Sequence, residues 1–355
     1  MESVKYLTLS KKIIQNKLAM KGLANSSLFR LDLAVTWKCN SRCRYCKVWE
    51  TYIRDPRSLK SELTKEDYKK LFNQVDVSWI HVTGGEPFLR EDLPEILEYA
   101  SEKIGSLIII DTSTNGLLTD RILEQVKRIL ENIDCKFVVG VSIDGSSDIH
   151  IKSRGVVDCW NRSISTYLEL RKMKKRFPNF DVHINHFLSP INVSHFDRFV
   201  KELKEKDINF DEVSIEVARV SPAFMNEGTV LALDKNKTIE ILKKVEHAYS
   251  SQKQTTRIKL RKRYAREMIN YLSSNKRKIP CAAGHSSIFI DPYGNVQPCG
   301  QLNVRIGNVK HDKIKDMMQS EEMKEFMQKF RTCQLCLSGC EGITSIVQDI
   351  PFSLI

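Results

Sequence analysis

The sequence contains no long hydrophobic run, because its purely apolar stretches reach only about five residues, as around residues 107–110. A membrane-spanning helix needs about 20 consecutive apolar residues, so we predict no transmembrane segment. The amino terminus also lacks an apolar segment with a small-residue cleavage site, which argues against export. No short repeat or low-complexity tract is visible. These absences favour a soluble protein that stays in the cytoplasm.

The chain of 355 residues is 41% apolar and 28% charged, which is typical of a globular protein. It is long enough for one barrel-sized domain and a smaller one. Ten cysteines in a cytoplasmic protein are better explained by metal binding than by disulfides. Eight of the ten fall into two groups, and only Cys135 and Cys159 stand alone. We expect those two to be buried core thiols.

The formal net charge is +12, and it is unevenly distributed. Residues 257–278 contain nine basic residues and one acid, Glu267. A basic run of this kind is usually the solvated face of a helix. The functional alternative is a surface for an anion such as a nucleotide, a nucleic acid or a carboxylate-rich peptide.

From residue 31 onward, short apolar strands alternate with amphipathic helices, as parallel βα units require. The expected strands are 31–35, 79–82, 107–111, 137–142, 182–187 and 213–217. This pattern predicts an α/β protein with a partial (β/α)6 barrel of the TIM type. Motifs in such a barrel act from the carboxyl ends of its strands.

Four segments are expected along the chain. They are an N-terminal helical lead-in (1–30), the barrel (31–225), a basic helical connector (226–279) and a small C-terminal α+β domain (280–355). In the lead-in, Ser10 is the expected N-cap and Gly22 the expected stop of a helix. In the last segment, an Asp-Pro-Tyr-Gly-Asn turn between apolar runs predicts a hairpin.

The first cysteine group follows the first expected strand with the spacing Cys39-x3-Cys43-x2-Cys46, and Tyr45 precedes the third cysteine. Three neighbouring thiolates suit a cubane iron–sulfur cluster with one iron free of protein ligands. A substrate or cofactor can coordinate at that open position. A structural zinc site is the alternative, but zinc needs a fourth ligand, and the next histidine is His81.

The second cysteine group lies in the C-terminal segment, as Cys281-x12-Gly294-x4-Cys299 and later Cys333-x2-Cys336-x3-Cys340. Five thiols are enough for one [4Fe–4S] cluster with one thiol to spare. Cys281 and Cys299 form the safer pair, and the choice among the other three stays open. A zinc ribbon is the alternative, since paired cysteines on hairpins also hold zinc.

The first cysteine motif resembles the signature of the radical SAM superfamily, and Thr83-Gly84-Gly85-Glu86-Pro87 follows where that family carries a similar motif. The C-terminal cysteines resemble the auxiliary-cluster region of the SPASM and twitch groups, although the full SPASM pattern has seven cysteines. The resemblance implies a [4Fe–4S] cluster on Cys39, Cys43 and Cys46 that binds S-adenosylmethionine and acts in catalysis. It also implies a second, auxiliary [4Fe–4S] cluster, with candidate ligands Cys281, Cys299, Cys333, Cys336 and Cys340.

The same resemblance implies which residues contact S-adenosylmethionine. Gly84, Gly85 and Glu86 match the segment that holds the amino group of the methionine part. Other segments resemble the lining of the adenosine pocket or contacts to the cofactor carboxylate. The residues implied there are Tyr45, Thr114, Asn115, Ser142, Asp144 and Arg154. Ordinary βα turns are the alternative explanation for these later segments.

We therefore expect a radical SAM enzyme that cleaves S-adenosylmethionine reductively and removes a hydrogen atom from a substrate. An external one-electron donor of the ferredoxin or flavodoxin type would supply the electron. The basic stretch favours an anionic small molecule or carrier-borne substrate, and modification of a peptide or protein is the alternative. A protein of another class, a metal-containing module that binds nucleic acid, is not favoured because it needs no open iron.

Overall fold

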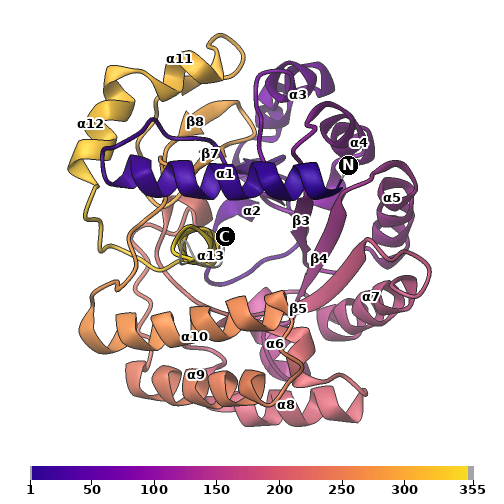
Figure 1. Cartoon of the computed structure of the whole chain (residues 1–355). Helices are drawn as coiled ribbons and strands as arrows, with labels where there is room; N and C mark the ends of the chain where they lie inside the picture. The colour runs from indigo at the N-terminus through magenta and orange to yellow at the C-terminus, as the bar shows by residue number, and fades with distance from the viewer. Residues whose placement is uncertain (1, 351–355) are drawn as a thin grey trace.

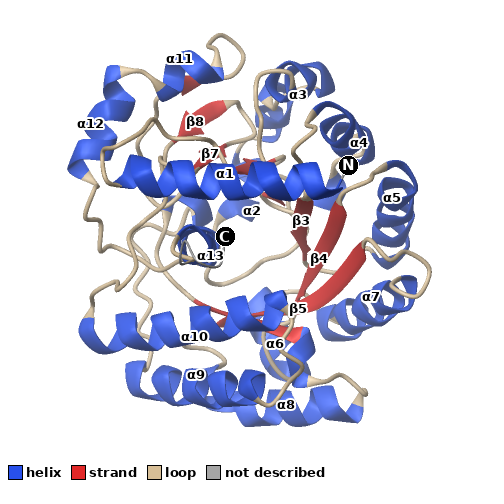
Figure 2. Cartoon of the chain, viewed as in Figure 1, coloured by secondary structure: helices blue, strands red, loops and turns tan. Residues whose placement is uncertain are grey.

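The computed structural model describes residues 2–350, and their strands form one sheet (Figures 1 and 2). The order is β6-β5-β4-β3-β2-β1-β7-β8-β9. The strands are β1 (Arg30–Ala34), β2 (Trp79–Thr83), β3 (Ile109–Thr114), β4 (Lys136–Ser142), β5 (Phe180–Leu188), β6 (Val213–Val217), β7 (Ser287–Ile290), β8 (Asn295–Gln297) and β9 (Gly307–Asn308). The six strands β1 to β6 are parallel and adjacent in sequence order, which confirms the predicted partial barrel.

The strand residues alternate between two environments. In β2, Ile80 and Val82 are fully buried beneath the helices, whereas His81 is only partly buried and faces the barrel interior. β5 repeats this alternation along nine residues. Successive side chains of a strand point to opposite faces, so each barrel strand gives one face to the core and the other to the interior.

The helices are α1 (Glu2–Met20), α2 (Val48–Arg54), α3 (Lys65–Phe72), α4 (Leu93–Lys103), α5 (Thr119–Asn132), α6 (Ser147–Arg154), α7 (Cys159–Met173), α8 (Phe196–Glu205), α9 (Lys235–Ser250), α10 (Thr256–Ser274), α11 (Ile314–Met318), α12 (Glu321–Lys329) and α13 (Gly339–Gln348). Helices such as α3, α4, α5 and α7 cover the outside of the barrel, whereas α13 lies near the centre (Figure 2). Thr64 begins α3 with a capping box, since Thr64 and Asp67 each accept the backbone N–H of the other. In residues 2–350, no helix is long and apolar enough to cross a membrane.

The N-terminal helix begins earlier than predicted. α1 starts at Glu2, and Ser10 lies in its interior, so the expected N-cap at Ser10 was wrong. The Ser10 hydroxyl donates to the Tyr6 carbonyl at 3.1 Å, which is the usual hydrogen bond of a serine within a helix. The left-handed residue Gly22, with φ of 76°, follows the end of the helix.

The C-terminal segment is built into the barrel sheet. The predicted hairpin is confirmed as β7 and β8, but β7 also pairs in parallel with β1 and continues the sheet. The last helix, α13, lies near the centre of the molecule in Figure 1 and contacts α1 and α10. At its start, a side chain on Gly339 would collide with Glu216 of β6. The start of α13 therefore lies against the Glu216 side chain, which faces the barrel cavity.

Candidate active site

The loop with the first three cysteines follows β1 and is held from two sides. The Gly85 N–H donates to the Thr36 carbonyl at 2.8 Å, which ties the loop to the segment after β2. On the opposite side, the Arg42 N–H donates to the Arg154 carbonyl at 2.9 Å, at the end of α6. These backbone contacts fix the path of the loop.

Cys39, Cys43 and Cys46 all line one cavity at the carboxyl ends of the barrel strands. Burial, followed by the neighbouring Cys43 sulfur, raises the pKa of Cys46 to about 12, and the same two causes raise the pKa of Cys39. Buried thiolates of this kind need a cation to stabilise them. Three thiols facing one cavity fit a [4Fe–4S] cluster that keeps an iron open toward the cavity.

A zinc site on Cys39, Cys43 and Cys46 would lack a fourth protein ligand. His81, the next histidine in the sequence, is held at Nδ1 by Asp111 at 2.7 Å, and its ring is hydrogen-bonded to Cys340. It therefore belongs to a different group of side chains. A closed structural zinc site normally has four protein ligands, so the three-cysteine loop fits an iron–sulfur cluster better.

Seven of the nine residues expected to contact S-adenosylmethionine line the same cavity. They are Tyr45, Gly84, Gly85, Thr114, Asn115, Ser142 and Arg154. The other two, Glu86 and Asp144, are buried behind the wall and support residues that do face the cavity.

Glu86 uses its carboxylate within the protein. It accepts hydrogen bonds from the Thr114 hydroxyl at 2.9 Å and from the Asn115 N–H at 2.7 Å. Burial nevertheless raises the pKa of Glu86 to about 7. Its carboxylate therefore joins the turn after β3 to the turn after β2.

The glycines at positions 84 and 85 let two backbone segments approach closely. A Cβ on Gly84, whose φ is 127°, would lie 2.3 Å from the Thr36 carbonyl oxygen. A Cβ on Gly85 would lie 2.2 Å from the Lys38 carbonyl oxygen. The two glycines therefore accommodate the close approach of the cysteine loop itself.

Asp144 organises a buried polar network beside the cysteines. It accepts a hydrogen bond from the Tyr45 hydroxyl at 2.6 Å and forms an ion pair with Arg154 at 2.7 Å. Burial opposes the charge, but Arg154 holds the pKa of Asp144 below its usual range. One guanidinium nitrogen of Arg154 lies 3.5 Å from the Cys43 sulfur. Arg154 thus places a positive charge next to the cysteine loop.

The cavity wall also contains residues that were not assigned to the site from the sequence. Arg219 donates through Nε to Gln301 at 2.8 Å and lies 3.5 Å from the Glu216 carboxylate. Phe224 and Phe289 add aromatic surface. The position of Glu216 at a strand end was visible in the sequence, but no motif marked Arg219 or Gln301.

Three of the five C-terminal cysteines, Cys281, Cys299 and Cys336, lie close together, and Cys333 lies near Tyr271, as Cys336 does. Cys281 and Cys299 share a small apolar cluster, and the pKa of Cys299 is raised by burial, then by Glu341, Cys281 and Cys336. Burial raises the pKa of the Tyr271 hydroxyl, and the nearby Cys336 and Cys333 thiols raise it further. Four thiols fit one [4Fe–4S] cluster or one zinc ion. The fifth, Cys340, lines the barrel cavity instead.

Comparison with known families gives two matches along the chain. Residues 33–203 match the radical SAM superfamily, and residues 281–341 match SPASM, an iron–sulfur cluster-binding domain. The GTP 3',8-cyclase 1 of Mycobacterium tuberculosis is 41% identical over 113 residues, which cover 29% of this chain and 32% of that protein. The match thus spans about a third of the length of that curated relative.

Two relatives match over more of the chain at lower identity. The cysteine-type anaerobic sulfatase-maturating enzyme of Clostridium perfringens is 23% identical, and the match covers 89% of each chain. The subtilosin biosynthesis protein AlbA of Bacillus subtilis is 22% identical, over 81% of this chain and 58% of AlbA.

Solved structures share the fold. The structure of anSMEcpe with bound AdoMet superposes with a TM-score of 0.60 at 19% identity, covering 86% of this chain and 88% of the other. Streptococcus suis SuiB bound to S-adenosylmethionine gives a TM-score of 0.58 at 15% identity, covering 87% and 69% of the two chains.

Proposed function

Because the chain belongs to the radical SAM superfamily and carries a C-terminal SPASM domain, we propose that it cleaves S-adenosylmethionine reductively and removes a hydrogen atom from a substrate in the barrel cavity. The observation that carries this proposal is that Cys39, Cys43 and Cys46 share one cavity with the Gly84-Gly85 turn. A [4Fe–4S] cluster on these cysteines would supply one electron to the sulfonium of the cofactor.

The chain's own residues would bind the cofactor and exclude water. Gly84, Thr114, Asn115 and Ser142 line the wall next to the cysteines and offer backbone and side-chain polar groups. Phe187 packs at a tilt against the Tyr45 ring with centroids 4.8 Å apart, and Phe224 packs edge-on against Phe187 with centroids 5.6 Å apart. This apolar wall would shield a reactive radical from solvent.

The basic stretch does not reach this cavity. Its residues lie on and just after α10, where Arg257 pairs with Asp181 and Arg266 with Glu246. Arg261 donates to the Asp211 carbonyl at 2.9 Å. None of its nine basic residues lines the cavity, so the basic stretch does not favour an anionic substrate over a peptide.

For the substrate, we favour a side chain of a peptide or protein. The relatives that match over 81% and 89% of this chain are named for bacteriocin biosynthesis and sulfatase maturation. The second candidate is a small anionic or carrier-borne molecule. Arg219 supports it, because this guanidinium lies in the cavity wall and fits a carboxylate or phosphate.

We further propose that the electron comes from a ferredoxin or flavodoxin and that the protein works in the cytoplasm. No disulfide joins any of the ten cysteines, all of which lie in the described part of the chain, and this suits a reducing compartment.

The test compares iron content and S-adenosylmethionine cleavage in anaerobically reconstituted protein. The wild type should hold about eight irons and release 5'-deoxyadenosine with a chemical reductant, if both sites hold [4Fe–4S] clusters. Replacing Cys39, Cys43 and Cys46 together with alanine should remove about four irons and abolish cleavage. The matched control is Cys135→Ala, which changes a buried core thiol outside both cysteine groups. Only trace iron in the wild type would refute the proposal.

The same assay separates the two substrate classes. Deuterated peptides and deuterated anionic metabolites are offered in turn, and transfer of deuterium into 5'-deoxyadenosine identifies the class that is used. An Arg219→Gln variant should raise the KM for an anionic substrate by about tenfold or more, because a charge-assisted hydrogen bond contributes about 1.5–3 kcal/mol. Unchanged KM in this variant would exclude Arg219 as the anion-binding group.

A further inference from the structure

Three adjacent barrel strands place polar side chains in one layer of the interior. Asp32 of β1 pairs in register with His81 of β2, and His81 pairs with Asp111 of β3. The three residues therefore lie at the same height, and their side chains point to the same face of the sheet. Asp32 and His81 also line the cavity that contains the first three cysteines.

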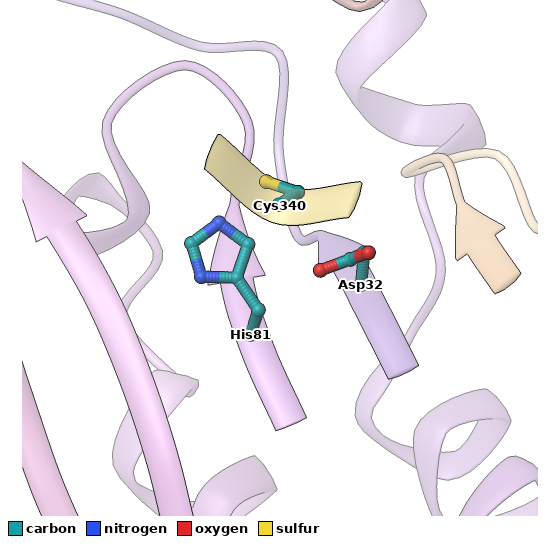
Figure 3. Close-up of side chains that lie close together, drawn as sticks. All are labelled: Asp32, His81 and Cys340. Carbon is teal, nitrogen blue, oxygen red and sulfur yellow. The ribbon is translucent and has the colours of Figure 1, made fainter. Parts of the chain in front are cut away.

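Cys340 completes this layer from the opposite side. It is the second residue of α13, near the helix N-terminus, where the helix dipole stabilises negative charge. Figure 3 shows its sulfur directed toward the His81 ring, with the Asp32 carboxylate beside both. One ligand atom from each of Asp32, His81 and Cys340 lies within 4.8 Å of the others.

Neighbouring groups hold these side chains in an orientation that suits a metal ion. The Asp111 carboxylate lies 2.7 Å from Nδ1 of His81, which leaves Nε2 facing Cys340. Arg30 donates through Nε to Oδ1 of Asp32 at 2.8 Å, which leaves the other carboxylate oxygen of Asp32 to face His81 and Cys340. A histidine that binds a metal commonly has its second nitrogen held by a carboxylate in this way.

The charges around Asp32, His81 and Cys340 also favour a cation. Asp32 and Asp111 are the carboxyl groups of this layer, and Arg30 is fixed as the partner of Asp32, whereas Asp111 faces His81. Buried anionic groups need compensating positive charge. The compensating positive charge is either a proton on His81 or a metal ion bound between Asp32, His81 and Cys340.

We propose that Asp32, His81 and Cys340 bind one Zn²⁺ ion whose fourth coordination position opens into the barrel cavity. One sulfur, one imidazole nitrogen and one carboxylate oxygen form a ligand set that zinc accepts, and three protein ligands are typical of zinc sites that bind a further molecule. Tetrahedral zinc keeps its ligand atoms about 3.5 Å apart, so small side-chain movements close the site. The fourth position takes an anionic or thiol group of the substrate.

This assignment also explains the five C-terminal cysteines. Cys281, Cys299 and Cys336 lie together, Cys333 lies with Cys336 near Tyr271, and the fifth, Cys340, lies beside His81 in the barrel. The proposal does not depend on cleavage of S-adenosylmethionine, since it concerns only this ligand set.

The experiment measures zinc and iron in reconstituted protein that has received one equivalent of Zn²⁺ anaerobically and has then been desalted. The variants His81→Ala and Cys340→Ser should each lose about one zinc per chain and keep all their iron. The controls His183→Ala and Cys135→Ser change a barrel-interior histidine and an isolated buried cysteine, and they should keep the zinc. X-ray absorption of the wild type should show one sulfur at about 2.3 Å and the remaining ligands at about 2.0–2.2 Å.

Three results would overturn the proposal. The wild type could bind less than a tenth of an equivalent of zinc, which would leave the proton on His81 as the compensating charge. Both variants could retain the zinc. Finally, Cys340→Ser could lose about four irons, which would make Cys340 a ligand of the auxiliary cluster. A zinc-filled auxiliary site would raise every zinc count equally, and the difference between variants and controls would remain.

Discussion

The contact between the Gly84-Gly85 turn and the cysteine loop gives the sharpest prediction. In a Gly85→Ala variant, the new Cβ would lie 2.2 Å from the Lys38 carbonyl oxygen and 2.7 Å from its carbonyl carbon. Both are backbone atoms that cannot rotate away. Since ordinary contacts begin at 3.4 Å, the two segments must separate by about an ångström.

That separation has a cost in stability and in cluster binding. Overpacking typically costs about 1–3 kcal/mol. The shift also strains two backbone hydrogen bonds of 2.8 Å, from Gly85 N–H to Thr36 and from Glu86 N–H to Lys38. Each such bond contributes roughly 1 kcal/mol. We expect a total loss of about 2–4 kcal/mol in the free energy of unfolding, and a loss of up to four irons because Cys39 follows Lys38 directly.

The assay combines urea unfolding with iron analysis under anaerobic conditions. Gly105→Ala is the matched control, because a Cβ at that position meets no atom within 4 Å. The control should retain wild-type iron and unfold within about 0.5 kcal/mol of wild type. If Gly85→Ala behaved like this control, the glycines would not be required by the cysteine loop.

Three further changes have defined outcomes. Asp144→Asn leaves the buried Arg154 without its charged partner and should lower the free energy of unfolding in urea by about 3–5 kcal/mol. The control Glu95→Gln, in the exposed ion pair with Arg128, should lower it by less than about 1 kcal/mol. Burial lowers the pKa of His186 to about 4, so stability should fall as the pH drops from 6.5 toward 4, by up to about 1.4 kcal/mol per pH unit. His186→Phe, which fits beside Phe199, should remove that part of the slope between pH 7 and 5, and an unchanged slope would contradict a neutral buried histidine. Thr64→Ala should lower stability by about 1 kcal/mol in urea unfolding through loss of the capping box.

The sequence predicts the parts of this protein that depend on local patterns. Alternation of apolar residues located all six barrel strands, and turn residues located the hairpin of β7 and β8. Cysteine spacing predicted the loop that lies at the cavity, because all three cysteines fall within eight residues of the chain. Long-range register determines what could not be predicted. Asp32, His81 and Asp111 come from three strands, and only strand pairing shows that they form one layer.

The roles of single residues within motifs were equally hidden. Glu86 and Asp144 stand in segments that the sequence assigns to the cofactor, but their carboxylates are satisfied inside the protein. Whether a motif residue faces a cavity or supports the residue that does depends on the path of the neighbouring loop. Cys340 could not be separated from Cys336 by spacing, because its direction follows from the position of α13.

The C-terminal segment takes part in the same cavity as the barrel. β7 extends the barrel sheet from β1, and Phe289 on that strand reaches the cavity wall. Gln301 and Cys340 reach the wall from the loop after β8 and from α13. A substrate that approaches Cys39 must therefore lie between the barrel and this segment. The C-terminal segment with the four remaining cysteines thus also shapes this cavity. Substitutions in that segment should therefore alter binding in the cavity.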